Sequence, residues 1–288
     1  MEIRVLRYFL EMAREGNMTR AAKRLNITQP TMSKQLKDLE TELGQKLFTR
    51  TNYNIKLTEA GLLLRKRAEN LLDMSDKIEK EFQFYNKFSG GDVYIGCAES
   101  YLIKYIATAI QAVQEDHPNI HYHFTSGDTS LVSGKLNEGL YDFALIAEPP
   151  DLSRYNYIEI PESNLWGVVM QITNPLASKQ QITFEDLLPY PIFASDQAFS
   201  VDIPRWCGEN VDKLNRLASF NLSTNSAFFT KEGLGLTLSF NKLIDTSPES
   251  GLVFRPLYPK LETKMYIIWM KYQVLTPAAS FLLKELKK

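Results

Sequence analysis

The chain has 288 residues and a mass of 33.0 kDa, a length that corresponds to about two domains at roughly 150 residues each. Hydrophobic residues make up 44% and charged residues 23%, which is typical of globular proteins and argues against a disordered chain. The longest apolar run, Met265 to Met270, is far shorter than the ~20 residues of a membrane span, and the first residues lack the apolar core of a secretory signal. Cys97 and Cys207 form no CxxC pair, which excludes a thiolate zinc finger and favours the cytosol.

Charge is unevenly distributed along the chain. Residues 1–66 carry 13 lysines and arginines against 7 acidic residues, whereas the remaining 222 residues carry 20 against 27. A basic N-terminal segment on an acidic body indicates contact with a polyanion. On charge alone, a solvated basic surface without a partner is an equal alternative.

Two helices joined by a tight turn are predicted in the basic segment. The first runs from Met18 to Leu25 and has Asn17 as its N-cap. Thr28 caps the second helix, which extends to about Leu43 and ends at Gly44. Helix, turn and helix in this order are typical of a DNA-binding motif whose second helix enters the major groove.

The second predicted helix has one narrow apolar stripe, formed by Met32, Leu36, Leu39 and Leu43. The opposite side carries hydroxyl, amide and ammonium groups, which can hydrogen-bond to base edges. An ordinary amphipathic surface helix is the alternative. The side chains expected to contact DNA are Thr19 of the first helix and Thr28, Gln29, Pro30, Thr31, Ser33, Lys34 and Lys37 of the second.

A hairpin and a long helix are predicted next. Residues 48–57 form the hairpin, a wing from which Arg50 and Lys56 reach phosphates or the minor groove. Thr58 caps a helix to about Lys87, whose apolar residues alternate at spacings of four and three. This seam indicates dimerisation, and packing against the chain's own second domain is the alternative. The seam consists of Leu64, Ala68, Leu71, Ser75, Ile78, Phe82 and Tyr85, and Ser75 is its one polar position.

Residues 7–61 resemble the N-terminal domain of LysR-type transcriptional regulators. The matching stretches are 18–22, 25–36, 39–40, 42–44, 47–50 and 57–61. The resemblance implies a winged helix-turn-helix, a dimerising linker helix and an effector-binding domain. It places Gln29, Pro30, Ser33 and Lys34 near base edges and Arg50 in the wing. Lys34 stands where the family more often has arginine, which makes a bidentate contact to guanine less favourable, and Tyr53 replaces a second wing arginine.

The acidic body alternates between strands and helices after a joint at residues 89–92. Strands at 93–97, 120–124 and 143–147 with helices at 101–116 and 129–138 predict a parallel sheet covered by helices. Further along, strands are expected at 165–170, 192–193, 220–222, 236–238 and 265–270, and helices at 224–232 and 277–287.

The pattern predicts an α/β multidomain chain. Its C-terminal part resembles the two-lobed, type 2 periplasmic-binding-protein-like fold of the family's effector domain, with hinges near Pro161–Leu165 and Lys260–Lys264. The expected division is residues 1–58 for the winged helix-turn-helix, 59–89 for the linker helix and 90–288 for the effector-binding domain. Within this domain, lobe I comprises 90–162 and 264–288, and lobe II comprises 163–263.

A small-molecule site is expected between the lobes, at the carboxyl ends of the strands. Ser100 and Thr129 each open a helix there, and helix N-termini attract a small carboxylate or another anion. Asp128 would repel an anion, which leaves an amine-bearing or polar effector open, and simple helix capping is the alternative for Ser100 and Thr129. The expected effector-binding set is Ser100, Tyr101, Gly127, Asp128, Thr129, Phe199, Ser200, Thr224 and Asn225.

Together these features predict a cytoplasmic transcriptional regulator that binds double-stranded operator DNA as a homodimer or homotetramer, responds to a small polar effector, and needs no membrane, cofactor or metal. An enzyme or a solute receptor with an appended helix-turn-helix head is the alternative. The enzyme would need a nucleophile, a metal cluster or a nucleotide loop, and the sequence contains no such motif.

Overall fold

The computed structural model describes residues 1–50, 55–83, 90–148 and 151–288, apart from the side chains of residues 50, 80, 81 and 83. The chain divides into two compact units, Met1–Gln83 and Phe84–Lys288. Within the described residues, no helix is both long enough and apolar enough to cross a membrane.

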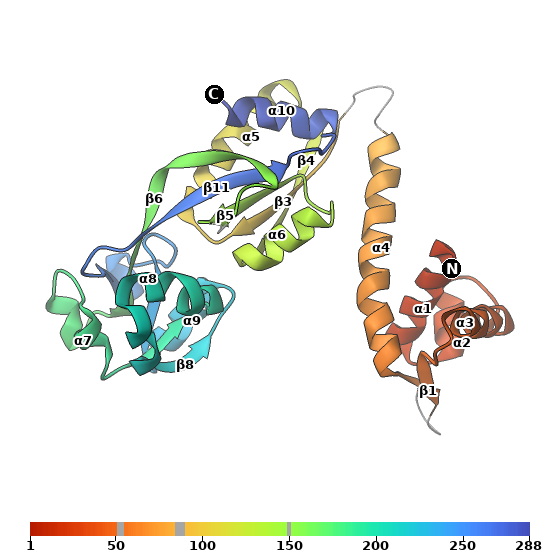
Figure 1. The fold of residues 1–288 in the computed structure, drawn as a ribbon, viewed down its shortest axis with the longest axis horizontal. Coiled ribbons are helices and arrows are strands. Elements are labelled where there is room, and N and C mark those ends of the chain that lie inside the picture. Colours follow the sequence, from red (N-terminus) through yellow and green to blue (C-terminus); the bar gives the residue numbers. More distant parts are fainter. Residues whose placement is uncertain (51–54, 84–89, 149–150) are drawn as a thin grey trace. The chain divides into compact units, whose positions relative to one another are not determined.

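The N-terminal unit is a helical core with a short hairpin and one long helix (Figure 1). Strands β1 and β2 pair antiparallel, with Phe48 opposite Leu57, which confirms the predicted wing; its turn lies outside the described residues. The elements are α1 (Ile3–Glu15), α2 (Met18–Arg24), α3 (Gln29–Leu43), β1 (Phe48–Arg50), β2 (Ile55–Leu57) and α4 (Glu59–Gln83).

The core of this unit forms where α3 packs on α1 and α2. Phe9 and Met12 of α1 are fully buried, and so is Met32 of α3. Two small residues, Ala21–Ala22, allow α2 to approach closely. Leu43, expected in the apolar stripe, is 40% exposed, because it is the last residue of α3 and lies at the end of the packed segment.

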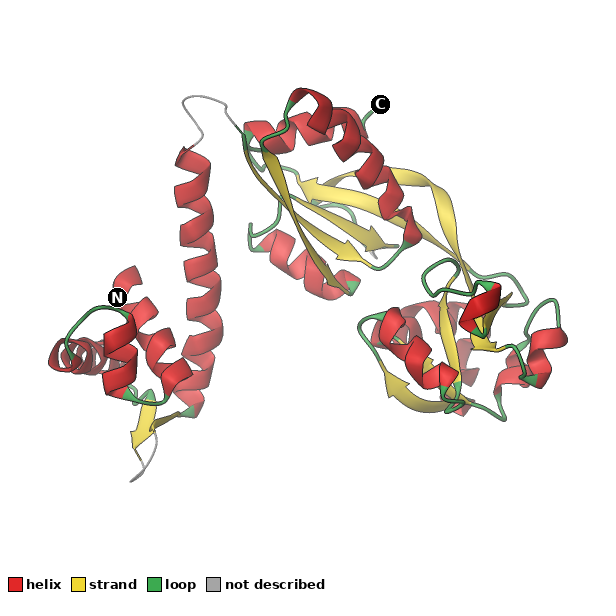
Figure 2. Ribbon diagram, turned by 180° about the vertical axis from the view of Figure 1, so that it is seen from behind, coloured by secondary structure: helices red, strands yellow, loops and turns green. Residues whose placement is uncertain are grey.

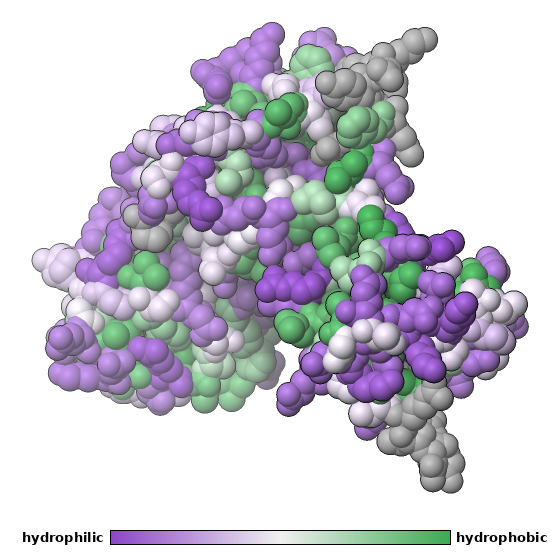
Figure 3. Space-filling model, turned by 45° about the vertical axis from the view of Figure 1, so that its right-hand side comes forward, coloured by the Kyte–Doolittle hydropathy of each residue, from purple (hydrophilic) through white to green (hydrophobic). Residues whose placement is uncertain are grey.

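The long helix α4 carries two apolar strips where a single seam was expected. Leu64, Ala68 and Leu72, spaced by four residues, pack on the core of the same unit. Leu71, Ile78 and Phe82 are exposed by 48%, 46% and 70%. The predicted seam therefore splits, since part of it is used inside the unit and the rest faces solvent; its last residue, Tyr85, lies outside the described residues. Figure 3 shows hydrophobic side chains at the surface of this unit, toward the right of the view.

The C-terminal unit is built on one long, mixed β-sheet with the strand order β4-β3-β5-β11-β6-β9-β7-β8, and β10 pairs with β6. Strands β3, β4 and β5 are parallel, as predicted from the alternation of strands and helices. The strands are β3 (Gly91–Ala98), β4 (Ile120–Gly127), β5 (Phe143–Ala147), β6 (Tyr155–Gln171), β7 (Pro191–Ala194), β8 (Asn215–Ser219), β9 (Leu236–Phe240), β10 (Leu252–Pro256) and β11 (Glu262–Met270).

Two separate hydrophobic cores define two lobes in this unit, which we call the first and the second lobe. The first is centred on β3, β5 and β11, and the second on β7, β9 and the second half of β6. Helices α5 and α10 cover one face of the first lobe's sheet and α6 covers the other (Figures 1 and 2). The helices are α5 (Lys104–Asp116), α6 (Thr129–Asn137), α7 (Phe184–Leu187), α8 (Ile203–Cys207), α9 (Ser223–Lys231) and α10 (Pro277–Leu286).

The lobes are joined by strands β6 and β11, which run antiparallel from one lobe into the other. The segments expected as hinges are the middle of β6 and the start of β11, where the register shifts between Lys264 and Tyr266. Two predictions here were wrong. The strand expected at 220–222 is β8 at 215–219, an exposed edge strand whose polar residues hide the pattern, and β6 begins ten residues before the apolar run expected at 165–170.

Candidate nucleic-acid interface and interlobe pocket

Helix α3 begins and ends at the predicted residues. The Thr28 hydroxyl accepts a hydrogen bond from the Thr31 amide at 3.4 Å, and the two threonine hydroxyls lie 2.8 Å apart. Gly44 ends the helix with a φ of 64°, a conformation that glycine adopts without strain. These caps satisfy terminal backbone groups that α3 would otherwise leave open to solvent.

The face of α3 expected to meet DNA is turned to solvent. Gln29, Pro30, Thr31, Lys34 and Lys37 are exposed, as are the cap Thr28, Thr19 of α2 and Lys56 of β2, while Ser33 is half-buried. The opposite side is anchored in the core, with Met32, Leu36 and Leu39 at most 4% exposed. A rigid helix thus presents a polar surface at its N-terminal end.

Three lysines at or near this surface differ from neighbouring basic residues in that they form no ion pair among the described residues. Arg20, Arg24 and Lys46 pair with carboxylates of the same unit, namely those of Glu15 for both arginines and Glu40 for the lysine. Lys34, Lys37 and Lys56 have no ion-pair partner within the described residues. Unpaired ammonium groups are available to phosphate oxygens. The side chain of Arg50 lies outside the described residues.

Glu40, which the sequence did not single out, ties α3 to the wing. Its carboxylate accepts hydrogen bonds from the backbone amides of Leu47 at 2.8 Å and Phe48 at 3.4 Å, and from the Lys46 ammonium at 2.8 Å. Burial acts to raise the pKa of Glu40, but these donors outweigh it and lower the pKa below its ordinary value. The carboxylate therefore fixes the wing relative to α3.

We expect Glu40→Ala to loosen the wing and to destabilise the N-terminal unit by about 1–3 kcal/mol, because buried amides lose their acceptor. Amide exchange in the segment 46–50 should accelerate, and the urea midpoint should fall. Because folding lowers this pKa, the contribution is present above the unfolded value near 4.5 and is lost as the pH falls below it. Asp38→Ala, an exposed carboxylate on the same helix, is the matched control; an equal effect of both variants would contradict this role.

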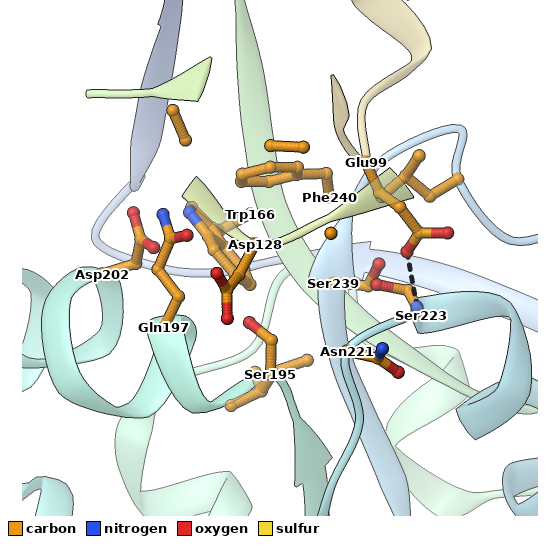
Figure 4. Close-up of a pocket in the computed structure, with 15 residues that line it drawn as sticks. Glu99, Asp128, Trp166, Ser195, Gln197, Asp202, Asn221, Ser223, Ser239 and Phe240 are labelled. Carbon is orange, nitrogen blue, oxygen red and sulfur yellow. Dashed lines mark hydrogen bonds between the residues drawn. The ribbon is translucent and has the colours of Figure 1, made fainter. Parts of the chain in front are cut away.

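A pocket of about 500 Å³, including its open mouth, lies between the two lobes of the C-terminal unit (Figure 4). The first lobe contributes residues at the carboxyl ends of β3, β4 and β5. The second lobe contributes residues of β9 and residues near the helical segment 198–202 and the start of α9. The lining residues are Ala98, Glu99, Gly127, Asp128, Ala147, Trp166, Ser195, Gln197, Asp202, Asn221, Ser223, Leu238, Ser239, Phe240 and Leu243.

Two of the five effector residues expected in the first lobe line this pocket, Gly127 and Asp128. Asp128 also caps α6, since its carboxylate accepts from the Leu131 amide at 2.7 Å. Ser100 is 5% exposed, and its hydroxyl donates to the Asn164 side-chain oxygen at 2.7 Å while it accepts from the Leu102 amide. This hydroxyl therefore acts as a helix cap, the alternative to effector binding.

The other two first-lobe residues also have partners within the protein. The Thr129 hydroxyl accepts from the Ala147 amide at 3.2 Å. The Tyr101 hydroxyl donates to Glu162 at 3.1 Å, and the Lys242 ammonium lies 4.4 Å from the centre of the Tyr101 ring. Neither residue lines the pocket.

None of the four residues expected from the second lobe lines the pocket. Phe199 is buried beneath the Arg216 guanidinium, and the Ser200 hydroxyl donates to the Asp196 carbonyl. Thr224 and Asn225 are exposed. The pocket is lined instead by their neighbours: Gln197 and Asp202 flank Phe199 and Ser200, and Ser223 opens α9 one residue earlier than expected. A shift of one residue turns a helical side chain by about 100°.

Side chains from one lobe cap helices of the other. The Glu99 carboxylate accepts a hydrogen bond from the Ser223 amide at the N-terminus of α9 at 2.5 Å (Figure 4). The Gln197 side-chain oxygen accepts from the Thr129 amide at the N-terminus of α6 at 3.0 Å. Both helix N-termini that flank the pocket, which could have held an anionic ligand, are thus occupied by groups of the protein.

A buried acid lies on one side of the pocket. Asp202 is 2% exposed and accepts from the Thr263 hydroxyl at 2.8 Å, and that hydroxyl accepts from the Trp166 indole. Burial raises the pKa of Asp202, against the opposing effects of the Thr263 hydrogen bond and the Arg205 charge. The Arg205 guanidinium lies 3.6 Å from Asp202 and also pairs with Glu148 of the other lobe.

A helix-turn-helix unit with a free polar face, joined to two α/β lobes around a pocket, defines the class of ligand-responsive DNA-binding proteins. Comparison with protein families makes this specific. Residues 3–62 match the bacterial regulatory helix-turn-helix protein, lysR family, and residues 87–288 match the LysR substrate binding domain. The chain belongs to the LysR family of DNA-binding transcriptional regulators.

Sequence identity to individual proteins is low, between 17% and 31% in the three comparisons that follow. The chain is 26% identical over 288 residues to the uncharacterized regulator YybE of Bacillus subtilis, covering 97% of this chain and 96% of YybE. It is 31% identical over 193 residues to AlsR of Bacillus subtilis, covering 67% of this chain and 63% of AlsR. The crystal structure of full-length CbnR with its target DNA superposes with a TM-score of 0.74 at 17% identity, over 100% of this chain and 99% of CbnR.

Proposed function

We propose that the exposed polar face of α3 reads base edges in the major groove, and that the wing contacts the neighbouring backbone. Ser33 and Lys34 point toward bases in this arrangement, with Gln29 and Pro30 at the tip of the helix. Lys37 and Lys56 neutralise phosphates. The observation that carries the proposal is that Lys34 and Lys37 of α3 have no ion-pair partner among the described residues. The opposite side of this helix is anchored in the core by Met32, Leu36 and Leu39. CbnR, which shares the fold, crystallises as a complex with its target DNA, and this agrees with the proposal.

We further propose that two copies associate through the exposed strip of α4, with residues 1–58 as the DNA-binding domain, 59–89 as the linker and 90–288 as the effector domain. Two winged domains then reach successive major grooves of a pseudo-palindromic operator. Two such dimers would form a tetramer. The protein acts in the cytosol, where chromosomal DNA lies, and regulates transcription without catalysing a reaction.

The interlobe pocket is proposed as the effector site. The lobes are connected by two strands, so a ligand that touches both lobes favours one degree of closure over another. Glu99 and Gln197 are the contacts that a ligand would rearrange, because each reaches from one lobe to a helix of the other. A shift in closure would re-aim the DNA-binding domains.

Selection of bound fragments from genomic DNA by the purified full chain tests the proposal. We expect recovery of a small set of fragments that share one inverted repeat. Footprinting on a recovered fragment should protect two half-sites about one helical turn apart. Recovery of random fragments, with binding that does not change between sequences, would contradict sequence-specific regulation.

A further inference from the structure

Two carboxylates of the interlobe pocket keep hydrogen-bond acceptors to spare. One oxygen of Glu99 is used by the Ser223 amide and one oxygen of Asp128 by the Leu131 amide. The second oxygen of each carboxylate has no donor in the part of the chain that the structure describes. A ligand in the pocket therefore meets two carboxylates, each of which has one oxygen available to accept a hydrogen bond.

A buried hydroxyl in the same pocket also lacks a partner. Ser239 of β9 is 2% exposed and lines the pocket, and its hydroxyl makes no hydrogen bond within the described residues. Figure 4 shows it among the lining side chains together with Glu99 and Asp128. Buried polar atoms are nearly always paired in native proteins, so an orphaned hydroxyl at a pocket wall indicates a site completed by a ligand.

Positive charge is scarce at this pocket. Among the described lining residues, three are acidic and none is lysine or arginine. The nearby Arg205 is engaged by Asp202 and Glu148. Both flanking helix N-termini are already capped by Glu99 and Gln197. An anionic ligand would find no cation among these described lining residues and would lie against carboxylates, which is unfavourable in a partly buried site.

We infer that the interlobe pocket binds a small molecule that carries a protonated amine and no carboxylate. The inference rests on the proposed function, because the pocket is taken as the effector site. An ammonium group of the ligand donates to the free oxygen of Asp128 and, in a diamine, a second one donates to that of Glu99, since Figure 4 shows the two carboxylates at separate places on the pocket wall. The Ser239 hydroxyl supplies a further polar contact. Of the ligand classes that the sequence leaves open, a small carboxylate and an amine-bearing or polar molecule, the inference favours the amine.

Calorimetry on the full chain with compounds of matched length tests this. The probes are α,ω-diamines of three to five carbons, the dicarboxylates and the diols of equal length. We expect at least one diamine to bind more tightly than its dicarboxylate and diol counterparts. Asp128→Asn should weaken that binding by about 10-fold or more, because a charge-assisted hydrogen bond is lost. Asparagine still caps α6, so folding is preserved.

Two further variants separate a site from a general charge effect. Ser239→Ala should weaken diamine binding while leaving the ligand-free melting temperature unchanged or higher, since the hydroxyl has no partner to lose among the described residues. Asp116→Asn, an exposed acid at the end of α5, should bind like the wild type. Tighter binding of a dicarboxylate, no binding of any diamine, or equal losses in Asp116→Asn and Asp128→Asn would overturn the inference. If the same preparation still binds its operator, only the ligand class is wrong, whereas loss of sequence-specific DNA binding would refute the proposed function itself.

Discussion

Replacing Ile78 and Phe82 of α4 by glutamate should separate the protein into monomers. Both side chains are exposed in the isolated chain, by 46% and 70%, and a dimer through this strip would bury them. Central apolar residues of interfaces contribute about 2 kcal/mol or more each, and a buried unpaired carboxylate adds a penalty of about the same size. We expect dimerisation to weaken by at least about 100-fold, measured by sedimentation of the full chain.

The loss of dimerisation in this double glutamate variant should also weaken DNA binding. A dimer engages two half-sites at once, and linked sites bind about 10² to 10⁴ times more tightly than one site alone. Lys66→Glu, an exposed change of charge on the same helix, is the control and should remain dimeric. A double glutamate variant that sediments with the same molecular mass as the wild-type dimer, and that has the same circular dichroism spectrum, would show that α4 does not form the dimer.

Lys34→Ala should weaken binding to the operator by about 1–3 kcal/mol, which is roughly 5- to 150-fold. Lys34 is exposed on α3 and has no ion-pair partner among the described residues, so its truncation leaves the fold intact. Ser33→Ala should also weaken binding to the operator. Lys271→Ala, an exposed lysine of the C-terminal unit, is the control and should bind as the wild type does.

The salt dependence of Lys34→Ala tells which part of DNA the lysine contacts. If it reads a base, the loss is confined to the operator and the salt slope is unchanged. If it neutralises a phosphate, affinity falls for all sequences and the slope decreases by about one. A variant that binds both the operator and random DNA like the wild type would refute the assignment of this face of α3.

The helix-turn-helix and the wing were predictable from the sequence because their signals are local, whereas α1 was not among the predicted elements. Asn17, Thr28 and Gly44 mark helix ends through contacts within a few residues, and the period of the apolar residues places α3 against the core. The strip on α4 was only partly predictable, since the sequence shows which residues are apolar but not which of two strips the core uses. Glu40 was missed because its partners lie seven and eight residues away, across a turn of unknown path.

The pocket was less predictable because it depends on pairings far apart in sequence. Glu99 meets Ser223 across 124 residues, and Gln197 meets Thr129 across 68. The position of Glu99, at the carboxyl end of a buried strand and directly before Ser100, was a signal that could have been used. The π-helical turn at Ala198–Asp202 has no such signal, and it decides that Asp202 and not Phe199 lines the pocket.

Whether α3 reads bases is measured by comparing two dissociation constants of the full chain, one for a selected operator and one for a duplex of the same length and composition with the half-sites scrambled. Both should be measured at the same salt concentration. A regulator that reads bases through α3 should prefer the operator by at least about 10³-fold, and both affinities should fall steeply as salt rises. Equal dissociation constants for the two duplexes would contradict it.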